Sequence, residues 1–378
     1  TLIYIIIRTN VIGYLFSSRL KITDLMNDPF VGMSGGERLA TILYTLGVYV
    51  KLLVFPHPLT HDYYPYHIPI MNFGKPGTLI SLALYIGLAF TFFKLWKQKN
   101  IYAWSIAFFV ATISIVSNLF FPVGTFMNER FIFIPSIAFS LVSAWVIVRH
   151  GFESQKQWAK YLAGAILIIL IAGYAFKTYD RIPAWKNALS LNGQAAVVSE
   201  NSARANSFMA TALFELGRDT SDYAAKKQLF DEAEFYAKRA IEIYPNYNAA
   251  NQIYAGLVAE RYQRDNNQQY LFDEFAKILD RRPDTEYVYQ FSEYLNRQLP
   301  PQTMADFYYR VAYEIMVTKN QEYPRAVQYL KLAETIAPND ARILFALGTA
   351  LYRGGDEVQG NEYLNRSYQL NPALRPQG

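Results

Sequence analysis

The chain has 378 residues, a net charge of +5, 52% hydrophobic residues and no cysteine. The lack of cysteine excludes disulfides, thiolate metal sites and a cysteine nucleophile. A positive charge can indicate nucleic-acid binding, but no basic run accompanies it, so we expect no nucleic-acid partner. The mean hydropathy of +0.02 averages two unlike halves, because nearly all the long apolar runs lie in residues 1–178.

The apolar runs of the first half predict helices that cross a bilayer, since a spanning helix needs about 20 largely apolar residues. Segments 77–96, 101–121, 131–148 and 161–179 meet this requirement, and 2–16 and 39–55 are shorter candidates. Segment 2–16 lacks the features of a signal peptide, so we expect an N-terminally truncated fragment whose upstream helices are missing. Segment 39–55 ends at Pro56 and either spans or is re-entrant. We therefore predict an all-α fold with about five to six membrane helices in residues 1–179.

Lysine and arginine in the loops predict the orientation. Positive residues cluster around the connection between segments 77–96 and 101–121, namely Lys94, Lys97 and Lys99. A second cluster lies between segments 131–148 and 161–179, namely Arg149, Lys156 and Lys160. The alternate loops, 57–76 and 122–128, contain only Lys75. By the positive-inside rule the lysine-rich loops are cytoplasmic. The other two loops, and everything after Tyr179, are then expected outside.

Residues 180–378 change to an amphipathic helical pattern and contain a repeat. Pro338 and Pro372 lie 34 residues apart, and each ends a similar helical phrase. In the last unit, 341–373, small residues at Gly348 and Gly360 would let two helices of a hairpin approach closely. A 34-residue helical hairpin is typical of the tetratricopeptide repeat (TPR), so we predict an extracytoplasmic α-solenoid of about four such units. Solenoids bind partners on a concave face, here a polypeptide acceptor or partner.

Glu129 and Arg130 lie at the start of segment 131–148, at its predicted outer end. An arginine side chain can hold two phosphate oxygens at once, so Arg130 could bind a lipid phosphate. The pair could equally be an interfacial ion pair, of Glu129 with Arg130 or with a neighbour, that only ends the helix. Residue chemistry alone leaves these two interpretations even.

The loop after segment 39–55 contains His57, His61, Asp62 and His67. Three histidines and an aspartate could ligate a metal or transfer protons. Their spacing matches no zinc pattern, so we predict no metal site and a rigid interfacial loop with one working side chain, Asp62. Glu37 and Arg38 follow two glycines at a helix start, and these glycines form no phosphate-binding fingerprint.

Three sequence blocks together resemble the transmembrane and tetratricopeptide-repeat O-mannosyltransferase family and its bacterial relatives. The first runs from Asn27-Asp28-Pro29 to Glu37-Arg38-Leu39-Ala40-Thr41. The second is Leu52-Leu53-Val54-Phe55-Pro56-His57-Pro58-Leu59-Thr60-His61-Asp62-Tyr63, and the third is Asn128-Glu129-Arg130-Phe131-Ile132-Phe133-Ile134-Pro135-Ser136. The order of a membrane region followed by outer repeats is also similar.

This resemblance implies a GT-C glycosyltransferase, which moves a sugar from a polyprenyl-phosphate donor to an acceptor such as a protein hydroxyl. It implies no cofactor beyond that lipid-linked donor. The acidic base of the family is expected upstream, so the catalytic residue is unknown, Asp62 is a weak candidate, and the fragment alone is expected to be inactive. Substrate binding is assigned to the matching block residues Arg130, Glu129, His61, Arg38 and Glu37.

Two other classes of function remain open. One is a non-enzymatic membrane-anchored TPR scaffold that assembles envelope or secretory proteins. The other is a transporter fused to a binding domain, for which inverted repeats would be expected and none is seen. We expect an integral protein of a bacterial inner membrane, with endoplasmic reticulum and lumenal repeats as the alternative.

Overall fold

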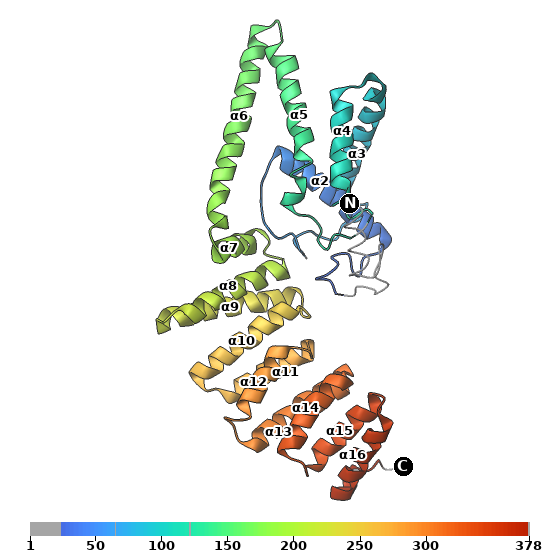
Figure 1. Cartoon of the computed structure of the whole chain (residues 1–378), viewed down its shortest axis with the longest axis vertical. Helices are drawn as coiled ribbons and strands as arrows, with labels where there is room; N and C mark the ends of the chain where they lie inside the picture. The colour runs from blue at the N-terminus through green and yellow to red at the C-terminus, as the bar shows by residue number, and fades with distance from the viewer. Residues whose placement is uncertain (1–23, 65, 121, 377–378) are drawn as a thin grey trace, which may run out of the picture. The chain divides into compact units, whose positions relative to one another are not determined.

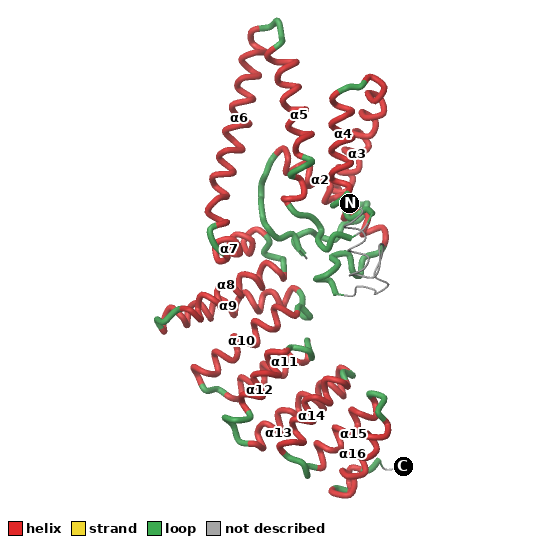
Figure 2. The backbone as a smooth tube through the Cα atoms, viewed as in Figure 1, coloured by secondary structure: helices red, strands yellow, loops and turns green. Residues whose placement is uncertain are grey.

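The structure is a computed structural model, and it describes residues 24–64, 66–120 and 122–376. Throughout these residues the regular elements are helices, as predicted (Figure 2). The chain divides into two compact units, Thr1–Ser202 and Ala203–Gly378. The predicted boundary at residue 179 therefore falls before helix α7, whereas the units divide after it. The predicted segment 2–16 lies outside the described residues.

The first unit is built from helical hairpins and the loops that join them (Figure 1). Its long helices are α2 (Gly35–Val54), α3 (Pro76–Leu95), α4 (Ile101–Ser114), α5 (Ser136–Val146) and α6 (Gln157–Arg181). Short helical turns extend them: η1 (Trp96–Gln98), η2 (Glu129–Ile132), η3 (Ile147–Phe152) and η4 (Ile182–Trp185), followed by α7 (Ala188–Val198). The α3–α4 and α5–α6 connections carry the two lysine-rich loops.

Two helical stretches among the described residues are long and apolar enough to cross a membrane, Pro76–Gln98 and Gln157–Trp185. Only 11% and 6% of their most apolar stretches are buried, so most of this apolar surface is not covered by the described residues. The prediction of about five to six spans is thus too high for this part of the chain. The predicted segments 101–121 and 131–148 form the shorter apolar helices Ile101–Ser114 and Ser136–Phe152.

Helix α4 is shorter than its apolar run because polar side chains end it. The Ser114 and Ser117 hydroxyls donate to main-chain carbonyls three residues earlier. Asn118 then adopts a left-handed backbone with φ of 62°, and its side-chain amide donates to the carbonyls of Thr125 and Phe126. Fourteen residues rise about 21 Å at 1.5 Å each, which is less than a bilayer core of about 30 Å.

Helix α2 begins with a capping box. The Ser34 hydroxyl accepts from the Glu37 main-chain N–H, and the Glu37 carboxylate accepts from the Ser34 main-chain N–H. One face of α2 is buried, including Tyr49, Leu52 and Leu53. This face packs in a core with the loop residues that follow α2 and α4. The core thus fixes the loops around residues 60 and 128, and both contribute to the candidate site.

The second unit is a row of stacked helices (Figure 1). Their bounds are α8 (Ala203–Asp219), α9 (Tyr223–Ile243), α10 (Asn248–Asp265), α11 (Gln268–Arg281), α12 (Glu286–Leu295), α13 (Pro301–Tyr309), η5 (Arg310–Asn320), α14 (Tyr323–Ile336), α15 (Ala341–Arg353), α16 (Glu357–Leu370) and η6 (Pro372–Leu374). The second helix of the predicted last hairpin ends at Leu370, just before Pro372, since proline cannot continue a helix.

The predicted close approach in the last hairpin is confirmed. A Cβ added at Gly348 would lie 2.8 Å from Leu364 atoms and 2.9 Å from the Gly360 carbonyl oxygen. A Cβ added at Gly360 would lie 2.7 Å from the Tyr352 main-chain nitrogen. Only glycine therefore fits at either position of the α15–α16 contact without displacing backbone.

Candidate functional site

Glu129 is the centre of a polar cluster in the first unit. Its Oε1 atom accepts a hydrogen bond from the Thr60 main-chain nitrogen at 2.5 Å and another from the Tyr63 hydroxyl at 2.8 Å. Among the described residues no hydrogen bond reaches Oε2. The carboxylate is therefore held in place through Oε1, and Oε2 can accept a hydrogen bond from a ligand. The two partners come from the loop after α2, more than 60 positions earlier in the chain.

Burial raises the pKa of Glu129 above its usual value. The hydrogen bonds from Tyr63 and Thr60 and the positive charges of Arg181 and Lys177 act in the opposite direction and lower it. Burial also raises the pKa of Tyr63, and the Glu129 charge adds to that rise. Tyr63 therefore stays a hydrogen-bond donor near neutral pH, and Glu129 is an acid closer to neutrality than an exposed glutamate.

Asp62 is 1% exposed and serves as an anchor of the same loop. Its Oδ2 accepts a hydrogen bond from the Ser202 hydroxyl at 2.7 Å, and its main-chain carbonyl accepts one from the Ser199 hydroxyl at 2.8 Å. The Ser199 and Thr60 hydroxyls also bond to each other at 3.2 Å. These contacts tie the loop to the end of α7, so Asp62 lies next to the Glu129 cluster but inside packed protein.

Asn128 connects the third sequence block to helix α2 and to the second block. Its main-chain nitrogen donates to the Tyr49 hydroxyl on α2 at 3.0 Å. Its side-chain nitrogen donates to the main-chain carbonyl of His61 at 3.3 Å, and its side-chain oxygen caps the turn at Arg130. Burial lowers the pKa of the neighbouring His67, so this ring is neutral near pH 7. The predicted residues His61, Asp62 and Glu129 thus lie in one connected region.

Arg130 points elsewhere. Its side chain is exposed and lies over the Phe131 ring, 5.6 Å from the ring centre. Glu129 and Arg130 form no ion pair among the described residues, and neither does Glu129 with any other cation. The described residues therefore show no direct ion pair here, although the charges of Arg181 and Lys177 act on Glu129.

Glu37 and Arg38 have local contacts. Glu37 completes the α2 capping box, and its main-chain bond from Ser34 is the largest cause of a lowered pKa. The Arg38 guanidinium lies 5.4 Å from the centre of the Phe30 ring. No contact joins either side chain to the Glu129 cluster within the described residues.

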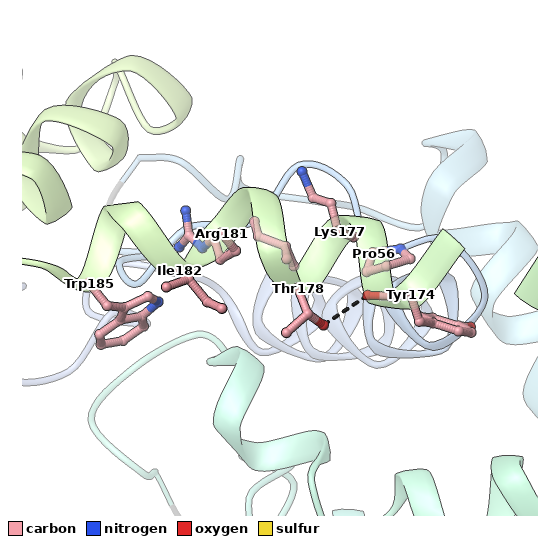
Figure 3. Close-up of a pocket in the computed structure, with 8 residues that line it drawn as sticks. Pro56, Tyr174, Lys177, Thr178, Arg181, Ile182 and Trp185 are labelled. Carbon is pink, nitrogen blue, oxygen red and sulfur yellow. Dashed lines mark hydrogen bonds between the residues drawn. The ribbon is translucent and has the colours of Figure 1, made fainter. Parts of the chain in front are cut away.

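An open pocket of about 290 Å³ lies at the end of α6 and was missed by the sequence analysis. Lys177 and Arg181 line it from α6, Trp185 from η4, and Pro56 and Leu59 from the loop after α2. Figure 3 shows Lys177 and Arg181 on the same side of the helix. Their spacing of four residues was a usable signal, since it places two cations on one helix face.

The described residues contain no group of three or more histidine, aspartate or glutamate side chains that could hold a metal ion. The chemistry that this region can support is that of a half-buried carboxylate, a neutral tyrosine and two nearby cations. The fold and its uncovered apolar helices support a membrane location for an all-helical protein.

Several curated proteins are similar to part of the chain. It is 25% identical over 241 residues to fruit fly protein O-mannosyl-transferase Tmtc3, a match of 61% of this chain and 24% of that protein. It is 28% identical over 211 residues to mouse protein O-mannosyl-transferase TMTC3 (54% of this chain, 22% of that protein). It is 26% identical over 234 residues to Caenorhabditis elegans protein O-mannosyl-transferase F38B6.6 (60% of this chain, 30% of that protein).

These matches support the resemblance to O-mannosyltransferases that the three sequence blocks indicated. The matched region amounts to about a quarter of the length of the curated relatives. No family model matches the chain.

Proposed function

We propose that this chain is part of a membrane glycosyltransferase that moves a sugar from a polyprenyl-phosphate donor to a protein hydroxyl. Its similarity to proteins named protein O-mannosyl-transferases is the observation that carries the proposal. The Glu129 cluster supports it independently, because it supplies a preorganised acidic group beside two cations.

In this proposal Glu129 binds a substrate hydroxyl through Oε2 while Thr60 and Tyr63 hold Oε1. A carboxylate can accept a hydrogen bond from a hydroxyl and take up its proton while the hydroxyl oxygen bonds to the sugar carbon. The bond from that carbon to the phosphate oxygen breaks, and polyprenyl phosphate leaves. The raised pKa suits this role, since a base with a pKa nearer the working pH takes the proton more readily. Asp62 is less suited, because its Oδ2 already accepts from Ser202 within a buried region.

The second unit is proposed to be a TPR-like solenoid that binds the polypeptide acceptor. A row of helix pairs supports this role, since such arrays offer an extended surface to partners. Removing residues 203–378 should therefore impair acceptor choice more than hydrolysis of the donor. A membrane-anchored scaffold would instead bind partners through this unit and transfer no sugar.

The deciding experiment is sugar transfer to an acceptor peptide by the natural protein reconstituted in nanodiscs. Glu129→Gln removes the charge while keeping a similar shape, and we expect transfer to fall about 100-fold or more. Arg149→Gln, which breaks an exposed ion pair with Glu153 at the helical turn η3, is the matched control and should leave transfer unchanged. Full activity of the Glu129→Gln protein would refute the role of Glu129.

The predicted role of Arg130 in phosphate binding stays a proposal and has its own test in the same assay. Arg130→Ala should weaken use of the donor while leaving binding by the second unit intact. Unchanged donor use would show that another cation of this unit binds the phosphate.

A further inference from the structure

We propose that Lys177 and Arg181 form a binding pocket for a phosphate group presented at the membrane surface. The proposal builds on the proposed function in one respect only, which is that a phosphate-bearing lipid is an expected ligand. The pocket lies where the apolar stretch Gln157–Trp185 ends. The polar cluster around Glu129 is close enough for both cations to lower the pKa of that carboxyl.

The Arg181 guanidinium has one edge without an acceptor. Its Nη1 donates to the Gln194 side-chain oxygen at 2.6 Å, which is a neutral partner. Its Nε is buried and has no hydrogen-bond partner, and no hydrogen bond involves Nη2 among the described residues. The edge formed by Nε and Nη2 is the fork that binds two oxygens of a phosphate at once.

Lys177 adds a second positive charge to the same side of α6 (Figure 3). It forms an ion pair with Asp180 at 3.2 Å, and the Asp180 side chain is 56% exposed. Exposed pairs of this kind contribute little to stability, so Lys177 can exchange its partner for a ligand. The pocket lining itself contains two cations and no acidic side chain.

Besides Thr178 and Tyr174, the remaining lining is apolar and suits a ligand that is part lipid. Pro56, Leu59, Ile182 and Trp185 face the pocket beside the cations. Trp185 and Tyr179 are 62% and 78% exposed at this end of the helix. Exposed aromatic residues at the end of a spanning helix are typical of the headgroup level of a bilayer. A phosphate carried by a lipid would lie at this level.

A simpler explanation is that the two cations only complement the negative end of the α6 dipole. Exposed side chains would serve that purpose equally well. They would not require a buried guanidinium nitrogen without an acceptor, and this feature of Arg181 is what a bound oxyanion would satisfy.

The test measures ligand binding rather than transfer, with the natural protein in phosphatidylcholine nanodiscs. The probes are farnesyl phosphate, farnesol, inorganic phosphate and a short-chain phosphatidic acid, followed by calorimetry. We expect farnesyl phosphate to bind and farnesol not to bind. Lys177→Gln/Arg181→Gln should weaken farnesyl phosphate binding at least about tenfold, and Arg181→Lys should recover part of it because it keeps the charge but lacks the fork.

Lys160→Gln is the matched control, since Lys160 is an exposed cation at the opposite end of the same helix. It should bind the probes like the unaltered protein. Lys177→Gln alone changes a side chain that is 25% exposed and leaves Arg181 in place, and it keeps the test valid if the Arg181 variants fail to fold. Equal binding of farnesol and farnesyl phosphate, or unchanged binding by correctly folded Lys177 and Arg181 variants, would overturn the proposal.

The source of the phosphate is distinguished by comparing phosphatidic acid with farnesyl phosphate. Binding of phosphatidic acid as tight as that of farnesyl phosphate, with the same dependence on Lys177 and Arg181, would assign the pocket to bilayer headgroups. Preference for farnesyl phosphate would assign it to a polyprenyl lipid. Both results support a phosphate pocket, and both hold even if Glu129→Gln proves that Glu129 has no part in sugar transfer.

Discussion

Replacing Tyr63 with phenylalanine removes the hydrogen bond that the tyrosine hydroxyl donates to the carboxylate of Glu129. The Tyr63 hydroxyl donates to Oε1 at 2.8 Å and lowers the pKa of Glu129. A hydrogen bond to a charged group contributes about 1.5–3 kcal/mol, and one pKa unit corresponds to about 1.4 kcal/mol. Because Glu129 is partly exposed to solvent, we take the lower end and expect its pKa to rise by about one unit.

The sign of this effect follows from the charged form being the active one. Activity that requires ionised Glu129 rises as pH increases through its pKa, which burial already places above the usual value of 4.5. Tyr63→Phe should therefore move the acid limb of the pH–activity profile to higher pH by about one unit. At high pH, where Glu129 is ionised in both proteins, the two activities should converge.

The measurement is sugar transfer in nanodiscs from pH 4 to pH 9, with the melting temperature recorded at each pH. Tyr66→Phe is the matched control, because Tyr66 lies in the same loop and its hydroxyl forms no hydrogen bond among the described residues. An acid limb at the same pH in the Tyr63→Phe protein would refute the reasoning. So would an acid limb that persists in the Glu129→Gln protein.

Two further predictions concern packing and helix capping. Gly360→Ala should lower the free energy of unfolding of the second unit by about 1–3 kcal/mol, because its Cβ would meet Tyr352 backbone. Chemical denaturation measures this free energy. Gly256→Ala is the control and should not destabilise the unit, because its Cβ would have ordinary contacts of 3.4 Å or more. Glu37→Gln should leave sugar transfer unchanged, because glutamine at this position still completes the capping box with Ser34. Loss of transfer with an unchanged melting temperature would instead show that the Glu37 side chain binds the substrate.

The sequence could predict those features that depend on neighbours along the chain. The apolar runs predicted α3 and α6 within a few residues of their bounds, because a spanning helix satisfies its own backbone polar groups. The 34-residue step likewise placed Gly348, Gly360 and Pro372 in one hairpin. Apolar composition overestimated the length of α4, since the hydroxyls of Ser114 and Ser117 and the turn at Asn118 end that helix early.

The arrangement of the site was decided by tertiary structure. Glu129 accepts from Thr60 and Tyr63, which lie 69 and 66 positions away, and no local pattern predicts which of two loops will meet. Arg130, next to it in sequence, lies over a ring instead. Pro56 and Arg181 share a pocket across more than 120 positions. The sequence by itself determined which segments are helical and apolar, and only the packing of α2, α6 and their loops decided which charges face one another, because long-range packing orients side chains that local periodicity leaves free.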